Sequence, residues 1–165
     1  MFRVLIFAAA TAASLAVPVQ LAAAAPAAAA ASGDALPEAA RAAAATVDAF
    51  HAALRRGDSA AALAFVADDA LVFEEGRAER SKAEYASHHA AADAAFSKAV
   101  PAVRMRRTGH SAGSLAWIAS ESRTRGSFKG RAVDRIMVET MVLRRAAGGW
   151  RIVHIHWSSA QPATE

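Results

Sequence analysis

The stretch Trp150-Arg151-Ile152-Val153-His154-Ile155-His156-Trp157-Ser158-Ser159 says most about the fold of this chain. Its β-branched and aromatic residues favour a strand, which we predict over 150–159. Alternate side chains of a strand point to opposite faces, so we expect His154 and His156 to lie on one face with Trp150 and Ile152. The opposite face would carry Val153, Ile155 and Trp157. Both faces are then covered, and the two imidazoles lie either at a buried interface or on the floor of a pocket.

The residues before this strand show first a helical pattern and then a period of two. We predict helices over 37–56, 58–66 and 81–99, a short strand over 70–75, and further strands over 102–109, 114–125 and 132–145. The run Ser81-Lys82-Ala83-Glu84 matches a capping box and indicates where the third helix begins. This order predicts an α+β fold, in which a curved antiparallel sheet packs against three helices and leaves a cavity between them.

The N-terminal residues predict export. Arg3 precedes an apolar run over 4–21, and small residues follow it, as in a secretory signal peptide. We therefore expect a cleaved signal peptide over 1–25 and a periplasmic or secreted location, with an uncleaved membrane anchor as the alternative. An Ala-rich leader over 26–36, one domain over 37–160 and a tail over 161–165 complete the expected organisation.

Composition and motifs exclude several classes of function. The chain has no cysteine, which excludes thiolate catalysis and Cys-ligated metal centres. The formal net charge is +4, carried mostly by arginine, but Tyr85 is the single tyrosine available for base stacking. Together with the expected export, this argues against a nucleic-acid partner, and we expect no membrane association once the signal is cleaved. A phosphate-binding glycine loop, a G-x-S-x-G nucleophile and an H-E-x-x-H zinc motif are all lacking from the sequence.

Four stretches carry a resemblance to a known family. They are Ala49-Phe50-His51-Ala52-Ala53-Leu54 with Gly57-Asp58; Phe73-Glu74 before Glu79-Arg80-Ser81; Glu84-Tyr85 before His88-His89; and the run from Gly149 to Ser158. With the element order, they resemble the nuclear transport factor 2-like superfamily, and most nearly its small SnoaL-like exported bacterial proteins. The resemblance implies a cone-shaped, cystatin-like α+β fold over about 37–160.

The resemblance does not imply one activity, because the superfamily includes ketosteroid isomerases, polyketide cyclases, dehydratases and transport factors. Its isomerases pair a carboxylate base with a tyrosine and a protonated acid. That set has no position-by-position match in this sequence, so it is not transferred.

Carboxylates and imidazoles in apolar runs are the candidate chemical groups. Glu74, Glu121 and Glu139 each have apolar neighbours on the strand, and a carboxylate buried without a partner should have a raised pKa, which suits a general acid or base. A structural ion pair or an exposed edge position is the alternative for each. The candidate catalytic residues are Glu74, Glu121, His154 and His156.

Three roles remain open for His154 and His156. They could ligate a metal, hydrogen-bond Ser158, Glu139 or nearby backbone, or contact a ligand. The spacing fixes no third ligand, so we expect no metal and no cofactor.

We expect the protein to bind a small apolar molecule in a largely apolar cavity. The expected lining is Phe73, Glu74, Tyr85, His88, Trp117, Glu121, Met141, His154 and His156. The alternatives are a cofactor-independent isomerase, cyclase or dehydratase that uses His and Glu for acid–base chemistry, and a dimeric interaction module. Val138 and Val142 lie opposite Met141 and Leu143, so we also expect a homodimer formed through the sheet.

Overall fold

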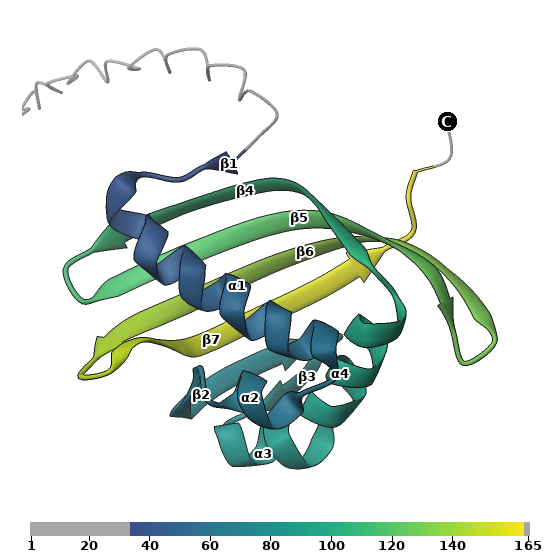
Figure 1. Cartoon of the computed structure of the whole chain (residues 1–165), viewed down its shortest axis with the longest axis horizontal. Coiled ribbons are helices and arrows are strands. Elements are labelled where there is room, and N and C mark those ends of the chain that lie inside the picture. The colour runs from purple at the N-terminus through teal and green to yellow at the C-terminus, as the bar shows by residue number, and fades with distance from the viewer. Residues whose placement is uncertain (1–33, 164–165) are drawn as a thin grey trace, which may run out of the picture. The chain divides into compact units, whose positions relative to one another are not determined.

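The computed structural model describes residues 34–163 (Figure 1). The predicted signal peptide and most of the leader lie outside the described residues. The helices are η1 (Glu38–Ala40, a 3-10 turn), α1 (Arg41–Arg56), α2 (Ser59–Leu63), α3 (Lys82–His88) and α4 (Ala90–Ala99). The strands are β1 (Asp34–Ala35), β2 (Val66–Glu74), β3 (Arg77–Glu79), β4 (Ala102–Ala112), β5 (Leu115–Phe128), β6 (Arg131–Ala146) and β7 (Gly149–Ala160).

The strands form one curved sheet in the order β1-β4-β5-β6-β7-β2-β3. Strands β4 to β7 form an antiparallel meander, whereas β2 pairs with β7, and β1 with β4, in parallel. In Figure 1, α1 runs across the sheet, and α2, α3 and α4 gather near β2 and β3. The predicted α+β fold is confirmed. None of the described helices has the length and apolar character needed to cross a membrane.

Helix α1 packs one face onto the concave side of the sheet. Val47, Phe50 and Leu54 recur at helical spacing and are buried. Gly57 ends the helix with φ +78°, a backbone conformation that glycine adopts without steric cost, and its N–H bonds the carbonyl of Leu54 at 2.8 Å. Phe50 stacks on Trp157 of β7, with ring centroids 6.2 Å apart. This contact fixes α1 over the strands that hold the site.

All three predicted helices have different bounds in the structure. The first opens as the 3-10 turn η1, and α1 begins at Arg41. The second helix ends at Leu63, and Val66 begins β2, because pairing with Ile152 of β7 outweighs its helical pattern. The third helix begins as predicted, with Ser81 Oγ accepting from the Glu84 N–H at 3.1 Å. It is interrupted at His89, whose backbone leaves the helical region, so α3 and α4 are separate helices.

The face assignment predicted for the last strand was wrong. The pairing of β6 with β7 shifts between Leu143–Ile152 and Val142–His154, which leaves Val153 as an extra residue in a β-bulge. A bulge reverses the alternation beyond it. Trp150 and Ile152 therefore face the core before the bulge, and Ile155 and Trp157 face it afterwards. His154 and His156 lie on the opposite, outer face.

Candidate functional site

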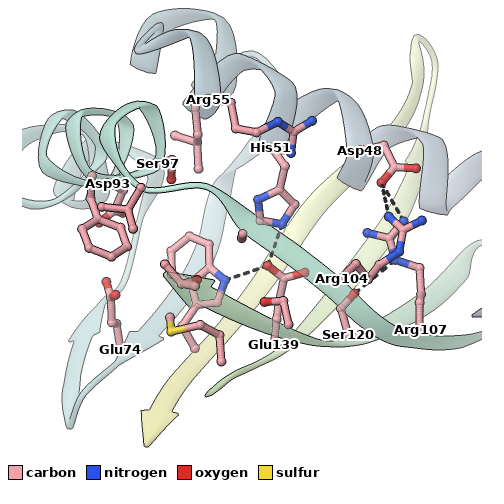
Figure 2. A pocket seen from close by; sticks show the side chains of 18 residues that line it. Asp48, His51, Arg55, Glu74, Asp93, Ser97, Arg104, Arg107, Ser120 and Glu139 are labelled. Atoms are coloured by element: carbon pink, nitrogen blue, oxygen red, sulfur yellow. Dashed lines mark hydrogen bonds and ion pairs between the residues drawn. The ribbon is translucent and has the colours of Figure 1, made fainter. Parts of the chain in front are cut away.

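A cavity of about 190 Å³ lies between the concave face of the sheet and helices α1 and α4 (Figure 2). Its lining combines apolar side chains with a dense set of charged and hydroxyl groups. The lining residues are Asp48, His51, Leu54, Arg55, Glu74, Asp93, Phe96, Ser97, Val100, Ala102, Arg104, Arg107, Ser120, Ser122, Thr124, Met137, Glu139 and Trp157.

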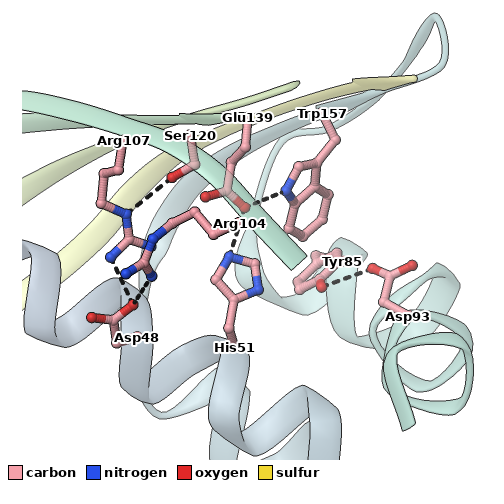
Figure 3. Close-up of polar contacts among 9 residues, drawn as sticks. All are labelled: Asp48, His51, Tyr85, Asp93, Arg104, Arg107, Ser120, Glu139 and Trp157. Atoms are coloured by element: carbon pink, nitrogen blue, oxygen red, sulfur yellow. Dashed lines mark hydrogen bonds and ion pairs between the residues drawn. The ribbon is translucent and has the colours of Figure 1, made fainter. Parts of the chain in front are cut away.

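Glu139 of β6 is a buried carboxylate in the wall of the cavity, with 9% of its surface exposed. One of its oxygens, Oε2, accepts two hydrogen bonds, from His51 Nε2 and from Trp157 Nε1, each at 2.7 Å (Figure 3). The other oxygen, Oε1, is buried and has no hydrogen-bond partner. Glu139 therefore places a buried carboxylate with one unpaired oxygen in the wall of the cavity.

The surroundings of Glu139 keep it ionised. Burial alone would raise its pKa, but attraction to His51, the hydrogen bonds from His51 and Trp157, and the nearby Arg107 together hold the pKa below its ordinary value. The carboxylate is therefore negatively charged at neutral pH and shielded from bulk water. A group in this state can accept a proton or a hydrogen bond from a bound molecule.

Helix α1 places three charged or polar groups along one face, because Asp48, His51 and Arg55 are spaced three and four residues apart. Asp48 accepts from Arg107 Nη1 of β4 at 2.7 Å. Arg107 is 3% exposed, and its Nε donates to Ser120 Oγ of β5 at 3.1 Å (Figure 3). The ion pair compensates the buried guanidinium and ties α1 to the sheet beside the cavity.

The far end of the cavity holds acidic groups in a less polar setting. Burial first, and then the nearby Asp93, raise the pKa of Glu74 to about 7. Burial also raises the pKa of Asp93, although the Tyr85 hydroxyl donates to its Oδ2 at 2.8 Å. Glu74 Oε2 is buried without a hydrogen-bond partner. At neutral pH a large fraction of Glu74 is therefore protonated and able to donate.

A second buried acid lies beside this end. Glu79 of β3 is 3% exposed and pairs with His89, the residue that separates α3 from α4. Glu79 lies opposite Val72 on the neighbouring strand, two residues from the level of Glu74, so both carboxylates point to the same face. The pair joins the helical layer to the edge of the sheet under the cavity.

Two of the four carboxylates that line the cavity, Glu139 and Glu74, have pKa values displaced in opposite directions. Glu139 is held as a base by His51 and Trp157, and Glu74 is held as an acid by burial. Such a separation is how one site provides a general base and a general acid at the same pH.

Of the nine residues predicted to line a cavity, Glu74 lies in this one. Tyr85 and Met141 are fully buried in the adjoining core, and Tyr85 reaches the cavity through its bond to Asp93. His88 is exposed, whereas its neighbour His89 turns inward to Glu79.

The other five residues of the predicted lining lie together on the outer face of the sheet. Phe73 pairs with His156 across β2 and β7, and its ring contacts His154 and His156 at centroid distances of 5.3 and 6.2 Å. Trp117 and Glu121 are exposed on β5. His154 Nδ1 donates to the Leu71 carbonyl at 2.9 Å, which matches the predicted hydrogen bond to nearby backbone. A role in binding stays a prediction for all nine residues. Within residues 34–163, no three His, Asp or Glu side chains are placed to hold a metal ion.

Sequence reasoning missed most of the site. Asp48, His51, Arg55, Asp93 and Arg107 were not among the candidates, and Glu139 was noticed only as a costly buried carboxylate. The spacing of Asp48, His51 and Arg55 on one helical face was a usable signal. The partners of Glu139 gave no such signal in the sequence, because they come from two distant elements.

Comparison with known proteins identifies the family. Residues 43–162 match the model of the SnoaL-like domain. A proposed ketosteroid isomerase from Shewanella frigidimarina is 37% identical, with a TM-score of 0.70 over 75% of this chain and 100% of that one. No curated protein matches.

Two more distant structures share the fold alone. A proposed calcium/calmodulin-dependent protein kinase II association domain from Xanthomonas campestris has a TM-score of 0.64 at 21% identity, covering 75% of this chain and 89% of that one. A proposed dehydratase of the nuclear transport factor 2-like family from Streptomyces avermitilis has a TM-score of 0.62 at 17% identity, covering 74% and 96%. The fold, the matched domain and the identity to the Shewanella protein together show that this chain belongs to the SnoaL-like family of the nuclear transport factor 2-like superfamily.

Proposed function

We propose that the protein is an acid–base enzyme that binds a small molecule in the cavity and moves a proton with its own side chains. The observation that carries this proposal is the buried carboxylate of Glu139, which lines the cavity and keeps one oxygen, Oε1, without a hydrogen-bond partner. Its second oxygen is held by His51 and Trp157, so the carboxylate is fixed in orientation before a substrate arrives.

In the reaction that this geometry supports, Glu139 Oε1 takes a proton from a carbon next to a carbonyl group. Glu74 in its protonated form donates to an oxygen of the substrate. In an isomerisation this is the carbonyl oxygen: the proton that Glu139 took returns to a different carbon, and the proton on the oxygen returns to Glu74 as the carbonyl re-forms. In a dehydration, the hydroxyl that leaves takes the proton of Glu74 and departs as water.

The family membership supports this class of chemistry. The Shewanella relative, at 37% identity over its whole length, is described as a proposed ketosteroid isomerase, whose reaction also requires proton transfer beside a carbonyl. Simple binding of a small molecule is the first step of the same proposal.

Hydrogen exchange tests the proposal without knowledge of the substrate. The protein is incubated in D2O with small ketones, hydroxyketones and keto acids, and the loss of the signals of protons beside the carbonyl is followed by 1H NMR. We expect faster exchange for at least one compound, and Glu139→Gln should slow it by roughly 100-fold or more, because the base is removed.

The matched control is Glu121→Gln, which makes the same chemical change on the outer face and should leave exchange unaltered. Equal exchange in the wild type and Glu139→Gln would contradict the proposal. So would slower exchange in both variants.

A second proposal concerns assembly and location. We propose that the protein works outside the cytoplasm as a homodimer formed through the outer face of the sheet, where Phe73, Trp117 and Val138 expose 37%, 41% and 45% of their surface. Sedimentation of the wild type and of Trp117→Glu tests the dimer, and a monomeric wild type would overturn it.

N-terminal sequencing of protein from a periplasmic fraction tests export, with cleavage expected between residues 22 and 31.

A further inference from the structure

Arg55 differs from the other charged side chains around the cavity. Asp48 is paired with Arg107, and Glu139 with His51. Arg55 lines the cavity one helical turn beyond His51, and the described part of the chain provides no hydrogen bond or ion pair for its guanidinium (Figure 2). The guanidinium of Arg55 is therefore left to bind a group that enters the cavity.

The carboxyl groups of the lining are engaged elsewhere. Burial raises the pKa of Glu74 to about 7, and Asp93 accepts the hydroxyl of Tyr85 at 2.8 Å. Arg104 interacts with Asp48 at 3.4 Å, on the side of the Arg107 pair. An anionic group that enters the cavity therefore meets the guanidinium of Arg55, which has no partner among the described residues.

An apolar surface adjoins this cation. Leu54, Phe96, Val100 and Met137 all line the cavity. The volume, about 190 Å³, is smaller than the roughly 300–1,000 Å³ of pockets that enclose drug-sized ligands. A four-ring steroid belongs to that larger class of ligand, so this cavity fits a smaller molecule.

We infer that the substrate is a small organic anion with an apolar body, most simply a carboxylate, whose charged end binds Arg55 and whose body lies against Phe96 and Met137. That this anion is a substrate rests on the proposed function, whereas its binding at Arg55 does not. The guanidinium can hold a carboxylate by two parallel hydrogen bonds, which a neutral ligand of the same shape cannot match.

Three probes test the inference directly: benzoate, its neutral counterpart benzamide, and the steroid 19-nortestosterone. The indole N–H of Trp157 donates to Glu139 inside the cavity, so its 1H–15N resonance reports occupancy. We expect benzoate at millimolar concentration to shift this resonance, benzamide to bind roughly 10-fold more weakly, and the steroid to leave it unchanged.

Arg55→Ala should weaken benzoate binding by roughly 10-fold and leave benzamide unaffected. Arg56→Ala is the matched control, because Arg56 also lies in the last turn of α1 but does not line the cavity. Equal binding of benzoate and benzamide, an equal effect of the two Arg variants, no benzoate shift, or a Trp157 shift by the steroid would each overturn the inference.

The two proposals fail separately. Benzoate should still bind to Glu139→Gln, since that variant keeps Arg55. Binding that follows this pattern without any enhanced hydrogen exchange would remove the catalytic proposal and keep the anion site. Enhanced exchange with no preference for benzoate over benzamide would keep the catalytic proposal and remove the anion site.

Discussion

Glu139 and Glu121 lie on neighbouring strands of one sheet but face opposite sides of it. Glu121 pairs with Val138, so the two glutamates are one residue apart in register. Glu139 is almost completely buried and is held by His51 and Trp157, whereas Glu121 is exposed. The histidines divide in the same way, with His51 on the cavity side and His156 on the outer side. The comparison shows that residue type alone does not give chemical character, which depends on the helices that cover one face.

The largest expected difference between the faces is in packing. Phe50 is fully buried under α1, so Phe50→Ala should lower the free energy of unfolding by about 3–5 kcal/mol. In the monomer, Phe73→Ala on the outer face should cost well under half of that, because Phe73 is 37% exposed there. Urea unfolding followed by circular dichroism measures both, and similar losses would show that the outer face is covered in solution.

A smaller effect is expected from the two tryptophans. Trp157→Phe removes a buried donor to Glu139 and should cost about 1–3 kcal/mol of unfolding free energy. Trp117→Phe, on the outer face, should change it by about 0.5 kcal/mol or less in the monomer. Thermal unfolding of both variants gives the comparison, and a larger loss in Trp117→Phe would reverse our assignment of the faces.

Glu74 should make stability depend on pH. Its pKa rises from 4.5 to about 7 on folding, so the folded state binds the proton more tightly. The resulting stabilisation is fully present below pH 4.5 and is lost as the pH rises through about 7. Glu74→Gln should therefore flatten the decline in stability across this range, with Glu121→Gln keeping the wild-type slope. Unfolding midpoints measured at several pH values test this, and equal slopes in all three proteins would count against it.

The smallest effect is expected at the histidine that the sequence favoured. His156→Ala should change the unfolding free energy by no more than about 0.5 kcal/mol, because the side chain is exposed. It should also leave hydrogen exchange of bound carbonyl compounds unaltered. A large loss of exchange would place the chemistry on the outer face.

The sequence predicted the fold well because local patterns determine most of it. Val47, Phe50 and Leu54 mark the buried face of α1, Ser81 and Glu84 mark the start of α3, and period-two alternation marks the meander. The two-residue β1 and three-residue β3 were missed, since such short strands form only where a neighbouring strand offers its edge.

The site was harder to predict because it depends on register and on distant contacts. One extra residue at Val153 moved His154 and His156 to the outer face, and a bulge of that kind has no clear local signature. Glu139 acquires its character from His51, which is 88 residues away along the chain. Glu74 was the exception, because its neighbours already indicated a buried carboxylate.

The central claim is that one cavity holds an ionised and a protonated glutamate at the same pH. Titration of the side-chain carboxyl 13C resonances measures this directly, with Glu74→Gln and Glu139→Gln providing the assignments. We predict a midpoint near 7 for Glu74 and a midpoint below 4.5 for Glu139. Two midpoints together near 4.5, or the reverse order, would contradict the account.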